Sequence, residues 1–379
     1  MIDRRVFSIG LGATLLSACS GGSVTQSAPS SQMKSVPNAG WDGWVAGFKG
    51  RAASKGISQA TIDRAFQGAG YLPDVIERDR NQTEFKRSLE DYLAIAASDE
   101  RVSKGKQMLQ RHGATLSRIE AQYGVEKEVI VAIWGLESRY GERRGDVPVV
   151  SALSTLAYDG RRGSFFESQL VASLKILQNG DTTPPNMTGS WAGAMGHTQF
   201  IPTSYLAYAV DFTGDGRRDI WSDDPTDALA SAAAYLARSG WVRGQAWGGE
   251  VGSAAASSGT PVAVLQPQVP GPRIAVFRNF QVLKRYNNSD SYAIGVGHLS
   301  DRIAGGGPFR TSFGPDKSGL TLEDRKELQR RLTAAGYDTQ GADGVIGSKS
   351  VAAISDYQRA NGLPVTGEPS VELLRRLGG

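Results

Sequence analysis

The chain has 379 residues, of which 40% are hydrophobic and 21% are charged, a composition typical of a soluble globular protein with two or three domains. Its one cysteine excludes a disulfide scaffold, a thiolate zinc cluster and a CxxC redox site. The three histidines lie far apart, which disfavours a histidine-rich zinc hydrolase. A net charge of +4 is too small an excess to indicate a nucleic-acid partner.

The amino terminus predicts export from the cell. Residues 1–18 combine Arg4 and Arg5 with an apolar stretch over Val6–Leu16, as secretory signal peptides do, and this stretch is too short to span a bilayer. The segment is followed by Cys19, within Leu-Ser-Ala-Cys, which resembles the bacterial lipobox. That resemblance implies a lipid anchor at Cys19 and a place on the periplasmic face of the outer membrane. An incidental cysteine in a soluble secreted protein is the alternative.

The rest of the chain divides by composition into four segments. Residues 19–40 are rich in Ser, Gly and Pro and predict a flexible tether. Residues 41–304 are mostly helical in pattern, with β-prone runs such as Ile274–Phe277 that predict a small mixed α/β subdomain. Residues 305–319 contain a Gly-Gly-Gly-Pro break and predict a linker, and residues 320–379 predict a compact module. Apolar spacing predicts helices over Thr83–Ala97, Asp99–Tyr123, Lys127–Arg139, Glu167–Gln178 and Pro225–Ser239.

The carboxy-terminal module predicts a three-helix unit. Its first helix starts at a capping-box-like Thr321-Leu322-Glu323-Asp324, and its second covers Ser348–Ala360. Apolar residues at helical spacing give these helices a core face: Leu328, Leu332, Val351, Ile354 and Tyr357. About 60 residues bury only a modest core, and these positions suffice for it.

One carboxylate is a candidate catalytic acid. Glu137 lies at the end of the apolar helix predicted over Lys127–Arg139. Apolar surroundings and the negative end of the helix dipole both favour the protonated form, so we expect a raised pKa for Glu137. A glutamic acid that stays protonated near neutral pH can protonate a leaving oxygen. An ion pair with a neighbouring arginine is the alternative for this window.

A second motif covers residues 190–205 and reads Ser-Trp-Ala-Gly-Ala-Met-Gly-His-Thr-Gln-Phe-Ile-Pro-Thr-Ser-Tyr. Its small residues allow a ligand to approach the backbone, and its polar and aromatic side chains suit a sugar chain. Together with the segments 134–141 and 285–293, it resembles the membrane-bound B type of lytic murein transglycosylases, a lysozyme-like family. The resemblance covers residues 41–303 and implies a mainly α fold, with a lysozyme-like helical catalytic domain.

The family resemblance implies cleavage of the β-1,4 bond between N-acetylmuramic acid and N-acetylglucosamine without water as the nucleophile. Glu137, which matches the family's catalytic glutamate, would first protonate the glycosidic oxygen. It would then accept the proton of the muramoyl C6 hydroxyl as that oxygen attacks C1, which gives a 1,6-anhydromuramoyl end. A single carboxylate that acts twice explains why no second acid is evident, although ordinary glycosidases need two.

The same resemblance implies which residues line the glycan groove, and it implies no required cofactor. The groove positions are Ser190, Gln199, Tyr235, Tyr286, Asn287 and Tyr292. Ser190 and Asn287 would hold the reacting sugar and its acetamido group, and the tyrosines would orient it, with core packing as the alternative for each tyrosine. The implied partners are the glycan strands and stem peptides of peptidoglycan; no protein partner is indicated.

An acidic loop begins at Asp211 and predicts a calcium site. Oxygen-bearing side chains alternate through Asp211, Thr213 and Asp215, with Gly at the sixth position, as an EF-hand loop requires. Arg217 stands at the seventh position, where an EF-hand loop uses a backbone carbonyl. The twelfth position is Ser222 in place of the bidentate Glu, which weakens calcium affinity unless Asp223, Asp224 or Asp227 reaches the ion. Some members of the family bind calcium at the matching segment. A hydrogen-bonded acidic turn without metal is the alternative.

The terminal module has its own resemblance, to the three-helix peptidoglycan-binding domain. The matching residues are Asp343–Gly347, Ser350–Ile354 and Tyr357-Gln358. Two other classes of protein are alternatives for the whole chain. One is a non-catalytic scaffold that only binds peptidoglycan, which the intact motif around Glu137 disfavours. The other is a serine acyl-enzyme using Ser31-Gln32-Met33-Lys34, which lies in the predicted tether and lacks a Lys-Thr-Gly partner.

Overall fold

The computed structural model describes residues 33–81 and 87–378. The predicted signal segment 1–18, the lipidation site Cys19 and most of the predicted tether lie outside the described residues. Over the described ranges the chain forms sixteen α-helices and five short β-strands, so the predicted mainly α class with a small mixed subdomain is confirmed. Within these ranges, none of the helices has both the length and the apolar character needed to cross a bilayer.

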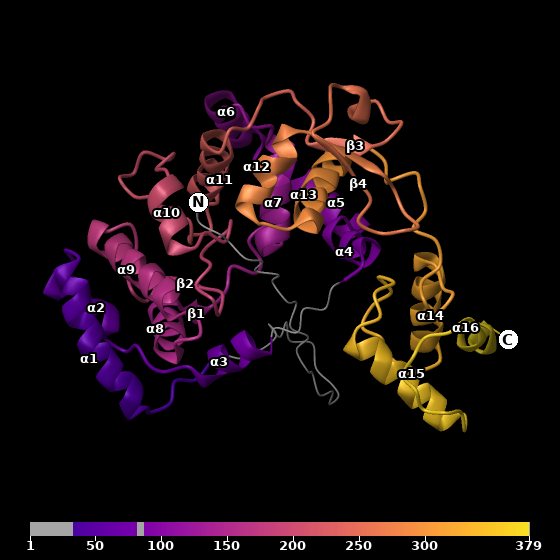
Figure 1. Ribbon diagram of the computed structural model, residues 1–379, viewed down its shortest axis with the longest axis horizontal. Coiled ribbons are helices and arrows are strands. Elements are labelled where there is room, and N and C mark those ends of the chain that lie inside the picture. Colours follow the sequence, from indigo (N-terminus) through magenta and orange to yellow (C-terminus); the bar gives the residue numbers. More distant parts are fainter. Residues whose placement is uncertain (1–32, 82–86, 379) are drawn as a thin grey trace. The chain divides into compact units, whose positions relative to one another are not determined.

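Two compact units make up the structure, and each combines two separate parts of the chain (Figure 1). Of the described residues, the first unit contains 33–81 together with His112–Ser239, and the second contains 87–111 together with 240–378. The first unit therefore holds Glu137 and the motif at residues 190–205. The second holds the three-stranded sheet and the carboxy-terminal module.

Helices build the described part of the first unit, and one two-stranded ladder lies beside them. The helices are α1 (Ala39–Ser54), α2 (Gln59–Phe66), α3 (Pro73–Arg80), α6 (Gly113–Tyr123), α7 (Lys127–Ser138), α8 (Val149–Asp159), α9 (Gly163–Asn179), α10 (Pro202–Tyr208) and α11 (Thr226–Arg238). Strands β1 (Val147–Pro148) and β2 (Thr188–Gly189) pair antiparallel. The predicted helices over Lys127–Arg139, Glu167–Gln178 and Pro225–Ser239 are confirmed, with α9 starting four residues earlier.

The core of the first unit forms around α7. Its residues from Val129 to Gly135 are all buried, as expected for a helix that is apolar on every side. Helices α6 and α11 pack against it, and α8 and α9 lie side by side after a tight turn at Gly160 (Figure 1). A buried carboxylate fixes that turn, because Asp79 on α3 pairs with Arg161 at 2.8 Å and with Arg162 at 2.5 Å.

The prediction of a single helix over Asp99–Tyr123 is wrong. The chain forms α5 (Asp99–Arg111), leaves helical geometry at His112, and continues as α6 from Gly113. Glycine is a poor helix former, and Gly113 directly follows the break at His112. The break is also the boundary between the units, since α5 belongs to the second unit and α6 to the first. The two halves therefore bury their apolar faces in different cores.

Helices α4 (Leu89–Ala96), α5, α12 (Arg278–Tyr286) and α13 (Asp290–Ile303) accompany a small sheet in the second unit. The helix predicted from Thr83 starts at Leu89; residues 82–86 lie outside the described ranges. The sheet has the order β3 (Gly248–Glu250), β5 (Ile274–Val276), β4 (Ala263–Leu265), and both pairings are antiparallel. The central strand is fully buried and coincides with the predicted β-prone run at Ile274–Phe277.

The segment 305–319 is held against the second unit by specific contacts. Glu250 accepts hydrogen bonds from the backbone N–H groups of Arg310 at 2.7 Å and Thr311 at 2.8 Å. The ring of Phe309 stacks on His298 with centroids 4.2 Å apart. This segment therefore follows a defined path from α13 to the carboxy-terminal module.

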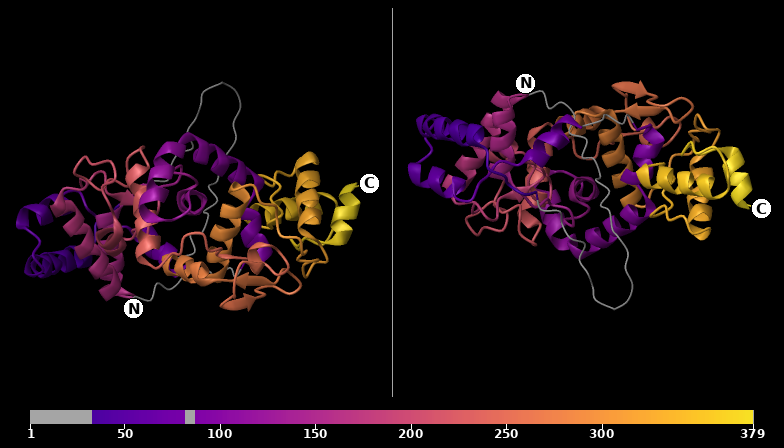
Figure 2. Two further views of the ribbon diagram at one scale, coloured as in Figure 1. Left: turned by 90° about the horizontal axis from the view of Figure 1, so that it is seen from above. Right: turned by 90° about the horizontal axis from the view of Figure 1, so that it is seen from below.

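Three helices form the carboxy-terminal module: α14 (Leu322–Ala334), α15 (Ser348–Ala360) and α16 (Val371–Gly378). They cluster together at the yellow end of the chain in Figure 2. The predicted capping box is present, with Thr321 and Asp324 bonded reciprocally. The core contains Leu320, Leu328, Leu332, Ile354 and Leu373.

Val351 does not belong to that core, so this part of the prediction is wrong. Its side chain is 40% exposed, whereas the preceding residue, Ser350, is 2% exposed. Gln329 donates a hydrogen bond to the Ser350 hydroxyl at 3.0 Å. This buried polar pair places Ser350 toward the core, whereas Ile354 and Tyr357 keep their predicted places, so Val351 alone falls outside the predicted core face of α15.

Arg325 on α14 lies at the centre of a buried ionic cluster. Its side chain is 4% exposed and pairs with Glu90 at 2.8 Å, Asp91 at 3.0 Å and Asp316 at 3.0 Å. Its Nε also donates to the carbonyl of Gly344 at 2.7 Å. Because Glu90 and Asp91 belong to α4, the guanidinium joins the module directly to the helical part of the second unit.

Candidate active site

Glu137 occupies the last turn of α7 and is half-buried. The helix ends in an unusual reversal, because the two residues that follow Ser138 both adopt the left-handed conformation: Arg139 at φ 50° and Tyr140 at φ 61°. Such a conformation costs non-glycine residues roughly 1–3 kcal/mol each, and it is concentrated at functional sites. The reversal fixes the direction in which the chain leaves Glu137.

Two glycines allow the reversal to pack tightly. A β-carbon at Gly135 would lie 2.6 Å from the ring of Tyr140, which folds back over the helix. A β-carbon at Gly141 would lie 2.6 Å from the imidazole of His197. Both distances are far shorter than a van der Waals contact, so glycine is required at each position for this geometry.

The motif at residues 190–205 is bonded directly to this helix end. The Ser138 hydroxyl donates to the backbone carbonyl of His197 at 2.6 Å. Strand β1 pairs with β2, and a β-carbon at Gly145 would lie 2.2 Å from the carbonyl carbon of Gly189. The structure therefore brings the predicted Glu137 motif and the predicted glycan-contacting motif together in one unit.

Ser190 and Gln199 are both placed by backbone hydrogen bonds. The Ser190 hydroxyl accepts from the N–H of Ala194 at 3.1 Å, which closes a tight loop. Gln199 has a left-handed backbone at φ 51°, and its side-chain NH₂ donates to the carbonyls of Arg144 at 3.0 Å and Gly196 at 2.8 Å. Since both amide protons are used inside the protein, Gln199 can offer a ligand only its carbonyl oxygen.

Tyr235 lies in α11 of the same unit and is only 5% exposed. Its ring packs 4.4 Å from that of Tyr208 and 6.0 Å from that of Phe200, measured between centroids. This burial matches the core-packing alternative. Direct contact of Tyr235 with a sugar stays a prediction.

The other three predicted groove residues lie in the second unit. Tyr286 ends α12, Asn287 caps it, and Tyr292 is in the first turn of α13. The rings of Tyr286 and Tyr292 are nearly parallel, at 9° and 6.5 Å between centroids. The structure thus brings these three together, and a groove that they share with Glu137, Ser190, Gln199 and Tyr235 stays a prediction.

The predicted ion loop gathers three carboxylates. One oxygen from each of Asp211, Asp215 and Asp227 lies within 4.8 Å of the others. Asp227 is 2% exposed, and burial raises its pKa despite hydrogen bonds from the N–H groups of Phe212, Thr213 and Asp219. A cation would offset this crowding of negative charge.

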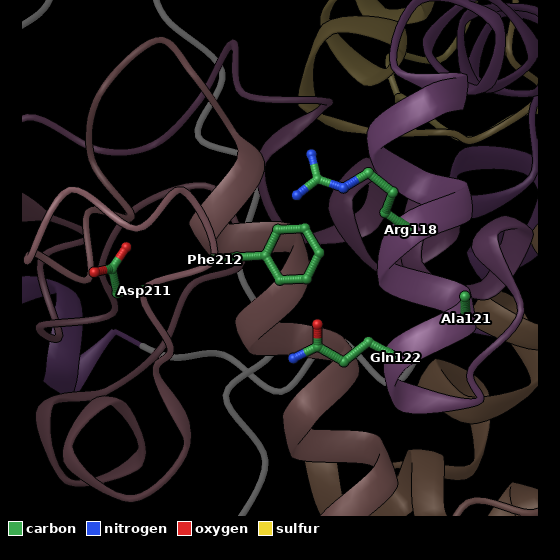
Figure 3. Close-up of a pocket in the computed structure, with 5 residues that line it drawn as sticks. All are labelled: Arg118, Ala121, Gln122, Asp211 and Phe212. Carbon is green, nitrogen blue, oxygen red and sulfur yellow. The ribbon is translucent and has the colours of Figure 1, made fainter.

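The remaining predicted ligands are bonded to the carboxylates of the ion loop. The Thr213 hydroxyl donates to Asp211 at 3.2 Å, and the N–H of Arg217 donates to Asp215 at 2.9 Å. An open hollow of about 490 Å³ borders the loop and is lined by Arg118, Ala121, Gln122, Asp211 and Phe212 (Figure 3). It leaves the Asp211 side of the loop accessible from solvent, which an entering ion would need.

Sequence reasoning missed the residues that hold the helix end in place. Trp134 donates its indole N–H to Nδ1 of His197 at 3.1 Å, and both side chains are buried. Arg144 donates to the carbonyls of Trp221 at 3.0 Å and Ser222 at 2.7 Å, and it pairs with Asp223 at 2.7 Å. The sequence offered no signal for these contacts, because the partners lie 63 to 79 residues apart along the chain.

Comparisons with known proteins place this site in a family context. Residues 40–260 and 252–301 match the family described as Transglycosylase SLT domain, and residues 321–377 match the Putative peptidoglycan binding domain. The Membrane-bound lytic murein transglycosylase B of Escherichia coli (strain K12) is 35% identical over 232 residues, 54% of this chain. The match spans 64% of that relative, less than two thirds of its length.

Solved structures are similar over a larger share of the chain. SltB3 from Pseudomonas aeruginosa, in complex with NAG-NAM-pentapeptide, is 41% identical, with a TM-score of 0.70; the similarity covers 90% of this chain and 100% of that one. The Escherichia coli lytic transglycosylase SLT35, in complex with calcium, is 29% identical, with a TM-score of 0.59, and the similarity covers 69% of this chain and 92% of that one.

Proposed function

Because the chain belongs to the SLT-domain family of lytic murein transglycosylases of the B type and carries a C-terminal peptidoglycan-binding domain, we propose that it is an enzyme that cleaves peptidoglycan glycan strands. The observation that carries the proposal is Glu137, a half-buried carboxylate at the end of a buried apolar helix. The strained reversal at Arg139 and Tyr140 supports a catalytic role for it, since strain of this kind is concentrated at functional sites.

The proposed reaction breaks the β-1,4 bond between N-acetylmuramic acid and N-acetylglucosamine. Glu137 gives its proton to the glycosidic oxygen as the C1–O4 bond breaks, and the substrate's own acetamido oxygen stabilises C1. The Glu137 carboxylate then accepts the proton of the muramoyl C6 hydroxyl while that oxygen bonds to C1. The products are a 1,6-anhydromuramoyl end and a free 4-hydroxyl, and Glu137 regains its starting state.

The residues proposed to bind the substrate are those that the family resemblance implies. Ser190 and Asn287 hold the reacting sugar and its acetamido group, and Gln199 accepts a hydrogen bond through its carbonyl oxygen. The parallel rings of Tyr286 and Tyr292 provide an orienting platform. The solved complex of SltB3 with NAG-NAM-pentapeptide supports extending the ligand to the stem peptide, and the terminal module supports a polymeric substrate.

A structural calcium ion is proposed for the loop that begins at Asp211. Asp211, Asp215 and Asp227 would hold it through carboxylate oxygens, the ligand type that calcium prefers. Thr213 and the backbone carbonyl of Arg217 complete the proposed set. The calcium complex of SLT35 supports this choice of ion. When bound, the ion would neutralise carboxylates and order the loop, and it takes no part in the reaction.

Anchoring at Cys19 is proposed from the sequence alone. Acylation there would place the enzyme on the periplasmic face of the outer membrane, with residues 19–40 as a tether. Metabolic labelling with a palmitate analogue tests it: label should enter the wild-type protein and be absent from the Cys19→Ala variant. Equal labelling of both proteins, or of neither, would exclude the anchor.

Mass spectrometry of digested sacculi tests the enzymatic proposal. The wild-type protein should release fragments with 1,6-anhydromuramoyl ends, and Glu137→Gln should lower the rate by at least 10²-fold, on the order expected for general acid–base catalysis. Glu142→Gln is the matched control, because that neighbouring carboxylate is exposed. Binding to sacculi without any cleavage by the wild-type protein would favour a non-catalytic scaffold instead.

A further inference from the structure

His197 is a buried side chain bonded to the end of α7, the helix that carries Glu137. It is 3% exposed, and its Nδ1 accepts from the Trp134 indole at 3.1 Å. Its Nε2 lies 2.7 Å from the carbonyl of Ser222, and its backbone carbonyl accepts from the Ser138 hydroxyl at 2.6 Å. His197 is therefore bonded both to the end of α7 and to the backbone at Ser222.

These contacts define a single protonation state. An indole N–H can only donate, so Nδ1 of His197 must be unprotonated, and the ring proton sits on Nε2, where it donates to Ser222. The Arg144 guanidinium lies 3.3 Å from Nε2, but both groups are donors, and Arg144 bonds to the carbonyls of Trp221 and Ser222 instead. Burial, aided by the charge of Arg144, lowers the pKa of His197 and keeps the ring neutral.

The two bonds from α7 are spaced so that they enclose Glu137. Trp134 and Ser138 are four residues apart and share one face of the helix, and Glu137 lies between them in the same turn. The imidazole also fills the space beneath the reversal, where a β-carbon at Gly141 would lie 2.6 Å away. The backbone of Glu137 can shift only if at least one of these contacts with His197 breaks.

We propose that His197, in its Nε2–H form, is a positioning residue that sets the place of the Glu137 carboxylate through Trp134 and Ser138. This inference rests on the proposed catalytic role of Glu137. His197 acts on the rate through geometry. A displacement of about 1 Å at a reacting group can lower the rate by about 10²-fold. The loss should therefore appear in kcat, with KM for soluble glycan fragments nearly unchanged.

Two substitutions test separately the hydrogen bond at Nδ1 of His197 and the one at Nε2. His197→Asn places Oδ1 where Nδ1 stands and retains an acceptor for Trp134, whereas His197→Gln reaches toward Ser222 and loses that acceptor. We expect His197→Asn to retain kcat within about threefold and His197→Gln to lose tenfold or more. Trp134→Phe removes the indole donor together with part of a buried ring, and it should reproduce the loss. The double variant His197→Gln/Trp134→Phe should lose no more than the worse single variant, because both remove the same bond.

A spectroscopic measurement tests the geometry without any assay of activity. The chain has three histidines, so the His197 signals in a long-range ¹H–¹⁵N spectrum can be assigned by comparison with His197→Asn. At pH 7 we expect the neutral Nε2–H tautomer. The Nδ1–H tautomer or a charged ring would overturn the inference, as would full kcat in a folded His197→Gln variant or additive losses in the double variant.

The outcomes also separate this inference from the proposed function. If Glu137→Gln keeps its turnover, the catalytic assignment fails and the positioning role fails with it, while the tautomer measurement is unaffected. If Glu137→Gln is inactive and His197→Gln keeps wild-type kcat, only the positioning role is overturned. Circular dichroism and binding to sacculi should be unchanged in every variant whose kcat is compared.

Discussion

Replacing Arg325 with methionine should destabilise the second unit by about 3 kcal/mol, because it removes the one cation from a buried ionic cluster. Methionine keeps much of the apolar stem and removes the guanidinium. Glu90 is 9% exposed and would be left buried without its partner at 2.8 Å. Asp91 and Asp316 are 30% and 27% exposed, so water screens them and they add less to the cost.

The magnitude follows from how completely each carboxylate is buried. Removing one partner of a buried ion pair typically costs about 3–5 kcal/mol, whereas an exposed pair is worth about 0–1 kcal/mol. Only Glu90 belongs clearly to the first class, which places the expected loss at the lower end of that range. Adding Glu90→Gln to the Arg325→Met background should recover more than half of the loss, because the glutamine carries no charge.

Hydrogen exchange measured by mass spectrometry gives the local free energy of opening for α4 and α14 in each variant. Both helices should lose protection in Arg325→Met and regain it when Glu90→Gln is added. Arg330→Met is the control, since that arginine is on the same helix and 54% exposed. A loss below about 0.5 kcal/mol in Arg325→Met, or no recovery on adding Glu90→Gln, would refute the reasoning.

Two further predictions concern calcium and pH. Calcium at a hundredfold excess over its Kd should stabilise the first unit by about 2.7 kcal/mol, and Asp211→Asn/Asp215→Asn should abolish the shift in Tm; equal Tm values for the wild-type protein in chelator and in calcium would exclude the ion. Burial lowers the pKa of His298 to about 4. The unfolded chain therefore binds this proton first, and His298 should lower the stability of the second unit as the pH falls from about 6.5 to 4. Burial raises the pKa of Asp301 to about 6, which has the opposite effect on stability over nearly the same pH range. Urea unfolding should therefore give a free energy of unfolding that is nearly independent of pH for the wild-type protein and that falls with falling pH for Asp301→Asn.

The sequence predicted those parts of the fold that local pattern determines. Helix α15 begins and ends at the predicted residues, and α7 is buried because it is apolar on every side. The prediction of one helix over Asp99–Tyr123 failed because the two halves of that segment belong to different cores, which periodicity alone does not reveal. The prediction that Val351 belongs to the core failed because a buried hydrogen bond between Gln329 and Ser350 overrides the apolar pattern.

The candidate site was predictable in its residue types but not in its contacts. The segment around Glu137 and the loop from Asp211 are contiguous in sequence, so their spacing could be interpreted. The bonds of His197 to Trp134 and of Arg325 to Glu90 join residues 63 and 235 positions apart. No local signal specifies such a pair. The use of both Gln199 amide protons within the protein likewise depends on where two distant carbonyls lie.

The contacts of Arg325 sharpen the prediction for a chain truncated after residue 319. Deleting Leu320–Gly379 removes the guanidinium, but it also removes the helix that covers Glu90 and Asp91. Both carboxylates then reach water, and the desolvation that makes Arg325→Met costly is relieved. We therefore expect the deletion to cost α4 less protection from hydrogen exchange than the single substitution does.

The truncated chain should bind intact sacculi more weakly and cleave short soluble glycans at close to the full-length rate. The proposed acid and groove residues all precede residue 305, and the module has its own core and capping box. A binding module raises the effective concentration of enzyme on a solid polymer, an advantage that a freely diffusing fragment does not feel. The cluster at Arg325 nevertheless joins the module to α4, so the assay must distinguish binding to sacculi from catalysis. If truncation abolishes cleavage of soluble fragments while α4 and α7 keep their protection, the module takes part in the active site and is more than an anchor.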